Sequence, residues 1–130
     1  MTNRTAFITG ASRGIGRACA VALADAGTRV AVAARSLDQL EDLAAELRAK
    51  GREAFPVAID MSSAESIKDA LAKTAKDFGA IAILVNNAGI TKDGLAMRMK
   101  KDDWDSVLAV NLTGSFLAIQ QVLPAMMRER

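Results

Sequence analysis

The hydrophobic positions of this chain follow a repeating order, in which a short apolar run precedes a segment with helical spacing. Four such runs occur, at Thr5–Thr9, Arg29–Ala34, Ala54–Ile59 and Ile81–Val85. Strands that alternate with helices predict a parallel sheet covered by helices, so the fold class is α/β. The last run is apolar on both faces, and we therefore expect it in the interior of the sheet. We interpret residues 1–130 as a single domain.

The segments between these runs carry apolar residues three and four positions apart, which predicts one buried stripe for each helix. The three predicted stripes are Ile15, Ala18, Cys19, Ala22 and Ala26; Leu40, Leu43, Ala44 and Leu47; and Ile67, Ala70, Leu71, Thr74 and Phe78. Glycines, Gly27 and Gly79, are expected to end the first and third helices. Capping boxes are predicted at the starts of the second and third helices, by Ser36 with Gln39 and by Ser62 with Glu65.

A loop from Ile90 to Lys101 should lead into a long helix that begins near Asp102 and runs to the end of the chain. Asn111 falls on the same stripe as Val107, Leu108 and Leu112, so we expect its amide on the inward face. Pro124 lacks the N–H that a helix interior needs, so we expect it to bend the helix and to displace or fray the last turn.

A glycine-spaced turn joins the first strand to the first helix, with the sequence Thr9-Gly10-Ala11-Ser12-Arg13-Gly14-Ile15-Gly16. Gly10 permits a sharp turn, Gly14 lets backbone N–H groups approach a pyrophosphate, and Gly16 allows close packing of the helix on the strand. The helix start supplies unpaired N–H donors and a partial positive charge. These glycines could be ordinary strand-to-helix residues, but the neighbouring Ser12 and Arg13 favour a phosphate site.

The charges around this turn indicate which dinucleotide it would prefer. A site for NAD(H) usually has an acidic residue at the end of the second strand, whereas this chain has Ala34-Arg35 there. Arg13 and Arg35 could both grip an adenosine 2′-phosphate, although Arg13 could also be a solvated loop cation. Asp38 lies further on, in the first turn of a helix, where the helix dipole explains it better. We therefore predict NADP(H) rather than NAD(H) as the cofactor.

Polar residues and a glycine follow the third and fourth strands, where ligands bind in parallel sheets. Asp60 ends the third strand and is also suited to an Asx turn, a use compatible with ligand binding. Asn86 and Asn87 end the fourth strand, and a structural role in holding neighbouring backbone is at least as plausible for them as a ligand contact. Gly89 should allow a cofactor to approach the backbone.

Composition narrows the possible chemistry. The chain has 51% hydrophobic residues, 25% charged residues and a formal net charge of +2, with no block of like charge. General nucleic-acid binding is therefore not expected. The single cysteine, Cys19, cannot form an internal disulfide and should be a buried packing residue, and without histidine no metal site of the usual N/S type is expected. No secretion signal or run of about 18 apolar residues is apparent, so we expect a cytoplasmic protein with no membrane span.

These motifs, in this order, resemble those of the short-chain dehydrogenase/reductase family. The resemblance rests on the turn from Gly10 to Gly16, on Asp60, on Asn86-Asn87-Ala88-Gly89 and on Asn111. The segments around Asn87 to Gly94 and Trp104 to Gly114 are similar to those of the 3-oxoacyl-acyl-carrier-protein reductases, which reduce a β-ketoacyl thioester with NADPH in fatty-acid synthesis. The resemblance implies a Rossmann-like doubly wound parallel sheet, limited here to four strands in the order 3-2-1-4.

The resemblance also implies roles for particular residues. Asp60, with Met61 beside it, would accept from the adenine amino group, and the motif residues Ile15 and Ala88 would contribute to the cofactor site. Asn111 would hold a water in a proton relay and mark a helix irregularity. The family's catalytic serine, tyrosine and lysine lie beyond the fourth strand and helix, and the 130 residues contain no tyrosine.

Three interpretations therefore stay open for this chain. It is the amino-terminal part of a reductase, as a fragment or truncation; a natural or engineered module that binds NADP(H) without catalysis; or an assembly unit. We expect a homo-oligomer, formed through the open edge of the fourth strand or through the helix from Asp102 to Met127. Basic residues near Arg128 and Arg130 could contact an acyl carrier protein, as they do in related reductases.

Overall fold

The structure, a computed structural model, describes residues 4–89 and 96–130, and in this part of the chain four parallel strands form one sheet. The strand order is β3-β2-β1-β4, as the sequence predicts. The elements are β1 Thr5–Thr9, α1 Gly14–Asp25, β2 Arg29–Ala34, α2 Leu37–Ala49, β3 Ala54–Ala58, α3 Ala64–Asp77, β4 Ile81–Val85, a 3-10 turn Ala96–Arg98, α4 Lys101–Leu108, a π-helical segment Ala109–Gly114 and α5 Ser115–Glu129. Half of the predicted loop, residues 90–95, lies outside the described residues.

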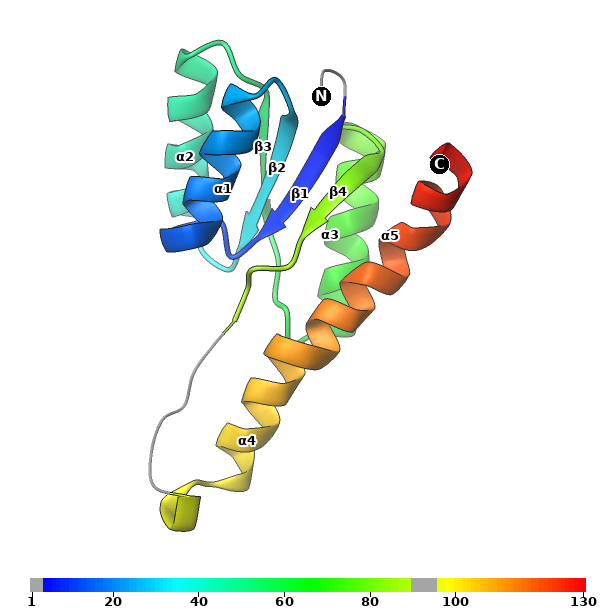
Figure 1. Ribbon diagram of the computed structural model, residues 1–130. Helices are drawn as coiled ribbons and strands as arrows, with labels where there is room; N and C mark the ends of the chain where they lie inside the picture. Colours follow the sequence, from blue (N-terminus) through cyan, green and yellow to red (C-terminus); the bar gives the residue numbers. More distant parts are fainter. Residues whose placement is uncertain (1–3, 90–95) are drawn as a thin grey trace.

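The sheet is covered by helices on both faces (Figure 1). Helices α1 and α2 cover one face, where Ile8 and Val32 belong to the buried core. Helices α3 and α5 cover the other, where the core includes Phe7 and Val57. Because successive strand residues point to opposite faces, strands buried on both sides are apolar throughout, which explains their uninterrupted hydrophobic runs.

The buried face of α1 differs from the predicted stripe. Gly16, Ala20 and Ala24 are buried, whereas Ile15 is 75% exposed and Cys19 is only half-buried. The remaining predicted members, Ala18, Ala22 and Ala26, are exposed. Because alanines occur at nearly every second position of this helix, hydrophobicity alone could not choose its orientation. The close approach of Gly16 to the turn after β1 chooses it instead.

The stripes of α2 and α3 are confirmed, except that Phe78 is only partly buried, but their capping boxes are not. Ser36 is the N-cap of α2, yet its side chain makes no capping bond. Helix α3 is capped one residue later than predicted, by Ser63, whose hydroxyl oxygen accepts from the amide of Ser66 at 3.2 Å. Ser62 is not the cap because its hydroxyl and amide both donate to Asp60.

The long helix begins at Lys101, one residue before the prediction, and continues to Glu129 through the π-helical segment. The segment stays helical past Pro124 to Glu129, so the last turn is not frayed, while a bend or displacement at Pro124 stays a prediction. Gln120 and Pro124 are both exposed, so water can bond the carbonyl that the proline leaves without a donor. By length and composition, residues Lys101–Glu129 would suffice to cross a membrane, a criterion that core helices also meet.

Strand β4 forms an edge of the sheet within the described residues, and its only strand neighbour there is β1. The expectation of an interior position is therefore wrong for this chain, although the predicted strand order already implies an open edge. Ile81 is buried, whereas Ile83 to Val85 are only partly buried. An apolar strand with a free edge is a surface that pairs readily with another strand.

Candidate functional site

A cleft of about 580 Å³ lies at the carboxyl ends of the strands, where a doubly wound sheet binds its ligands. Its walls come from the β1–α1 turn, the end of β2, the start of α2, the β3–α3 turn, the end of β4 and the π-helical segment. The lining residues are Gly10, Ser12, Arg13, Gly14, Ile15, Ala34, Arg35, Ser36, Gln39, Ile59, Asp60, Met61, Ser62, Asn87, Ala88, Gly89 and Val110. A cavity of this size falls in the range typical of small-molecule sites.

The β1–α1 turn has the backbone that its glycines allow. Gly10 and Gly14 have φ angles of 64° and 61°, in the left-handed region that favours glycine. A Cβ built on Gly10 would lie 2.9 Å from the Asn87 side-chain nitrogen and 3.0 Å from Ala88 Cα, whereas one built on Gly14 would meet nothing within 4 Å. Gly10 therefore serves a close approach between strands, while the space at Gly14 is open for a ligand.

Gly16 lies behind the cleft, in contact with the same turn. A Cβ built there would collide with the Gly10 carbonyl oxygen and would lie 2.5 Å from the Asn87 side-chain nitrogen. Any larger residue would push α1 off the sheet. Close packing at Gly16 thus explains both its burial and the orientation of the whole helix.

The amino-terminal end of α1 points its unpaired amides at the cleft. None of the described backbone carbonyls accepts a hydrogen bond from the amides of Gly14, Ile15 or Gly16 outside the helix ladder. Arg13, the N-cap residue, makes no side-chain capping bond, and the first turn holds no acidic residue. The partial positive charge of the helix start is therefore not neutralised by its own first turn, which is the condition for anion binding.

Hydrogen bonds hold the ends of β1 and β4 together beneath the cleft. The Thr9 hydroxyl oxygen accepts from the amides of Asn87 and Ala88, at 3.0 and 2.9 Å, and the hydroxyl lies 3.3 Å from the Val85 carbonyl. The Asn87 side chain donates to the Gly10 carbonyl at 3.2 Å. Asn87 therefore fastens the glycine turn to β4, which is the structural role considered for it, while still lining the cleft.

Asp60 forms the Asx turn expected at the end of β3. Its Oδ1 accepts from the Ser62 hydroxyl at 2.6 Å and from the Ser62 amide at 3.0 Å. These two bonds from Ser62, together with the positive charge of Arg35, hold the pKa of Asp60 below its ordinary value of 3.8, against the opposing effect of partial burial. Asp60 is thus a carboxylate at neutral pH, able to accept a hydrogen bond from a ligand.

Two arginines bring positive charge to the cleft. Arg13 and Arg35 are exposed, and neither forms a salt bridge with any residue in the described part of the chain. The guanidinium groups are therefore available to a ligand anion. Among the described residues, Asp60 is the one carboxylate that lines the cleft beside the two arginines, so the described part of its wall is positive overall.

Sequence reasoning located most of this cleft and missed part of it. Every residue expected to bind cofactor lines it, except for Gly16, which lies behind it. Ser36 and Gln39 were assigned only to a cap, although their place directly after β2 could have indicated the cleft. Val110 had no such signal, because the tertiary structure brings its helix to the site.

Asn111 lies on the π-helical segment, which agrees with the helix irregularity that the resemblance implies. Asn111 and Leu112 are both exposed, so the predicted stripe is not buried at these two positions. The extra residue in a π turn rotates the following side chains relative to an α-helical pattern. The Asn111 side chain faces the end of β4, where a Cβ built on Gly89 would lie 3.4 Å from Asn111 Oδ1.

A second groove, of about 660 Å³, lies between α2 and α3 beside β3. Its lining includes Leu37, Pro56 and Lys73 but no residue of the glycine turn. Neither the start of α1 nor either cleft arginine lines it. The helix start and the two arginines, which are suited to binding an anion, therefore line the smaller cleft at the strand ends and not this groove.

The fold and this cleft define a doubly wound α/β protein of the dinucleotide-binding class. The family model for short chain dehydrogenases matches residues 4–130, and the chain belongs to that family. Among curated proteins, it is 46% identical over 129 residues to the 3-oxoacyl-[acyl-carrier-protein] reductase FabG of Staphylococcus epidermidis, a match that covers 98% of this chain and 53% of the relative. It is 42% identical to the 3-oxoacyl-[acyl-carrier-protein] reductase of Synechocystis, covering 100% and 53%. The chain spans about half the length of these relatives.

Solved structures agree with this assignment. A metagenomic short-chain oxidoreductase in complex with NADP matches at a TM-score of 0.95 with 36% identity, covering 99% of this chain and 59% of that one. A gluconate 5-dehydrogenase from Burkholderia cenocepacia, in complex with NADP and tartrate, matches at 0.92 with 34% identity, covering 99% and 51%.

Proposed function

We propose that this chain is the NADP(H)-binding portion of an oxidoreductase similar to the 3-oxoacyl-acyl-carrier-protein reductases. One observation carries the proposal: the start of α1 opens into a cleft lined by Arg13 and Arg35. Among the described residues, no backbone carbonyl outside the helix accepts from its first amides, and no carboxylate forms a salt bridge with either arginine. Similarity to reductases of that name and to solved structures in complex with NADP supports it.

The residues of the cleft fit such a cofactor in distinct ways. The open space at Gly14 and the α1 amides would take the diphosphate, and Ser12 would donate a further hydrogen bond. Arg13 and Arg35 would grip the 2′-phosphate, which NAD(H) lacks. Asp60 would accept from the adenine amino group, with Met61 beside it.

Ile15, Ala88 and Gly89 would bound the remainder of the cofactor site along the same cleft. Ile15 is an apolar wall that is 75% exposed in this chain, and a bound ligand would cover it. When bound, the cofactor supplies the hydride for reduction of a β-ketoacyl thioester. Of the residues that form the family's catalytic set, this chain contains Asn111.

The 130 residues contain no phenol to donate the proton that carbonyl reduction requires. We therefore propose that this polypeptide by itself binds cofactor and does not turn over substrate. A pure sample that oxidised NADPH with a β-ketoacyl thioester well above background would overturn this part of the proposal while leaving cofactor binding intact.

A fluorescence titration with NADPH and NADH tests the cofactor assignment. Replacement of Arg35 by Asp removes a charge-assisted contact worth about 1.5–3 kcal/mol, which corresponds to a loss of roughly 10- to 150-fold in affinity for NADPH. NADH affinity should not fall, because NADH has no 2′-phosphate. Lys68→Asp is the matched control, since Lys68 is an exposed residue of α3 that does not line the cleft. Equal loss for both nucleotides would refute the role of Arg35.

A second candidate function, homo-oligomeric assembly, rests on the exposed face of the long helix. Large apolar side chains recur there three or four positions apart, at Trp104, Leu108, Leu112, Phe116, Ile119, Leu123 and Met127, with exposures from 38% to 73%. We propose that this apolar stripe, or the free edge of β4, forms the contact between copies.

Sedimentation of matched double variants tests the assembly proposal. Phe116→Glu with Ile119→Glu should dissociate an oligomer formed through the apolar stripe and leave intact one formed through β4. Gln120→Glu with Gln121→Glu, which changes two exposed polar residues of the same helix, should dissociate neither. A stable wild-type monomer at high concentration would refute assembly. For the complete enzyme we further propose a cytoplasmic location and contact of Arg128 and Arg130 with an acyl carrier protein.

A further inference from the structure

Gly114, the last residue of the π-helical segment, makes an unusually close approach to the β3–α3 turn. It is buried, and a Cβ built on it would lie 2.5 Å from the Met61 carbonyl oxygen, 3.2 Å from the Ala109 carbonyl oxygen and 3.3 Å from Met61 Cε. Two of these three neighbours are backbone atoms, which cannot rotate away. Only glycine allows the helix to lie at this depth.

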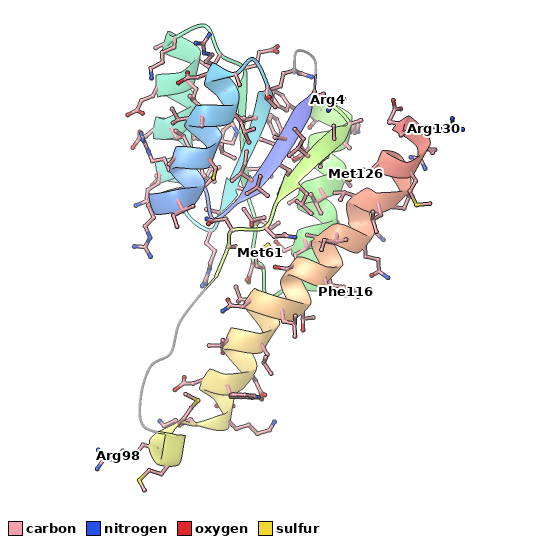
Figure 2. The ribbon with its side chains drawn as sticks, viewed as in Figure 1. Arg4, Met61, Arg98, Phe116, Met126 and Arg130 are labelled. Carbon is pink, nitrogen blue, oxygen red and sulfur yellow. The ribbon has the colours of Figure 1, made fainter. Side chains whose placement is uncertain are left out.

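The turn that Gly114 touches is a wall of the cleft. Met61 is the middle residue between Asp60 and Ser62, which are joined by two hydrogen bonds. All three residues line the cleft. Figure 2 shows Met61 between the carboxyl ends of the strands and the long helix. The position of the Asp60 carboxylate is therefore tied to whatever holds the Met61 carbonyl in place.

The same helical segment touches the cleft at a second place. Val110 lines the cleft, and the side chain of Asn111 lies near Gly89 at the end of β4. A shift of the segment away from Met61 would thus also move Val110 and Asn111. One small residue at position 114 sets the spacing between the helix and two walls of the site.

We propose that Gly114 is a positioning residue for the adenosine half of the cofactor, acting through the Met61 carbonyl on the Asp60–Ser62 turn. The inference rests on the proposed function, since it assigns Asp60 and Met61 to the adenine side of the cleft. An added methyl group at position 114 forces the turn or the helix to move by several tenths of an ångström. Ligand-binding groups tolerate little displacement of that size.

The experiment measures affinity for 2′,5′-ADP and NADPH, together with thermal unfolding, for the 130-residue chain. Gly114→Ala should weaken 2′,5′-ADP binding by roughly tenfold. Thr113→Ala, an exposed change in the same segment, should leave binding unchanged. Val122→Ala removes buried contacts of α5 without adding bulk, so it should lower the melting temperature while leaving 2′,5′-ADP affinity unchanged.

Each outcome decides one of the two proposals. Wild-type protein that binds neither ligand refutes the proposed function itself. If the wild type binds and Gly114→Ala binds with the same affinity, only the role of Gly114 is refuted. The role of Gly114 is also refuted if Val122→Ala loses as much affinity as Gly114→Ala does.

Should Gly114→Ala fail to fold, amide NMR of the wild-type chain decides the question. Addition of 2′,5′-ADP should shift the amide resonances of both Met61 and Gly114, because the two residues move as one contact. A shift at Met61 with none at Gly114 would overturn the inference.

Discussion

Replacement of Gly14 by Ala tests two roles of this glycine: the open space that a bound phosphate needs, and the left-handed backbone conformation that the turn needs. Gly14 and Gly51 offer a matched pair, because their φ angles are 61° and 79° and a Cβ built on either would meet nothing within 4 Å. Gly14 lines the cleft, whereas Gly51 follows α2 and does not line it. Both alanine variants therefore strain the backbone in the same way, but only in Gly14→Ala does the new methyl group point into the cleft.

The shared cost comes from the left-handed conformation. Holding a non-glycine residue there costs about 1–2 kcal/mol, so both variants should lose that much free energy of unfolding. The total free energy of unfolding of a domain of this size is roughly 5–15 kcal/mol, so both variants should stay folded. In Gly14→Ala alone, the methyl group occupies the space beside the α1 amides. Loss of one charged hydrogen bond, at about 1.5–3 kcal/mol, would weaken NADPH binding by roughly 10- to 150-fold.

Urea unfolding and NADPH fluorescence titration of the two variants form the assay. The expected result is an equal fall in unfolding free energy with an affinity loss confined to Gly14→Ala. Equal NADPH affinity in both variants would show that the space at Gly14 is not where the phosphate lies, and would refute the reasoning from the glycine turn.

Three further predictions follow from individual contacts. Gly10→Ala should destabilise the fold by about 1–3 kcal/mol more than Gly51→Ala, because its Cβ would also press on Asn87 and Ala88; equal urea midpoints would contradict this. Ser62→Ala should raise the pKa of Asp60 toward 3.8, measured by carboxyl NMR titration. Because the folded pKa of Asp60 is depressed, the ionised carboxylate stabilises the fold above pH 3.8, and this stabilisation is lost as pH falls through the folded pKa. The stability advantage of wild type over Ser62→Ala should therefore shrink in that acid range. An advantage that stays constant with pH would argue against the hydrogen bond from Ser62 to Asp60. Leu71→Ala, at a buried position of α3, should cost about 2–5 kcal/mol in urea unfolding, and a loss below about 1 kcal/mol would mean that the site refills.

The strands and the faces of two helices could be predicted from local pattern alone. The bounds of β1, β2 and β4 agree with the apolar runs, and α2 buries the predicted Leu40, Leu43, Ala44 and Leu47. In these helices strongly apolar residues alternate with polar ones, so one face is clearly favoured for burial. Helix α1 lacks that contrast because alanine occupies most of its faces.

The glycine turn, the charged residues of the cleft and the family could likewise be predicted from the amino-acid sequence. Phosphate binding by a strand–turn–helix depends on local backbone geometry, and the order of Gly10, Gly14 and Gly16 specifies that geometry within a short segment. The Asx turn at Asp60 is equally local, because it needs only the two residues that follow.

Contacts between distant segments were decided only by the tertiary structure. The orientation of α1 depends on the fit of Gly16 against Gly10 and Asn87, and the placement of Val110 and Gly114 depends on how a helix much further along the chain meets Met61. Such contacts are set by the packing of backbone against backbone, which leaves no periodic trace in the order of amino acids. Local periodicity and turn chemistry act over a few residues, whereas the depth of a helix against a sheet is known only when both are in place.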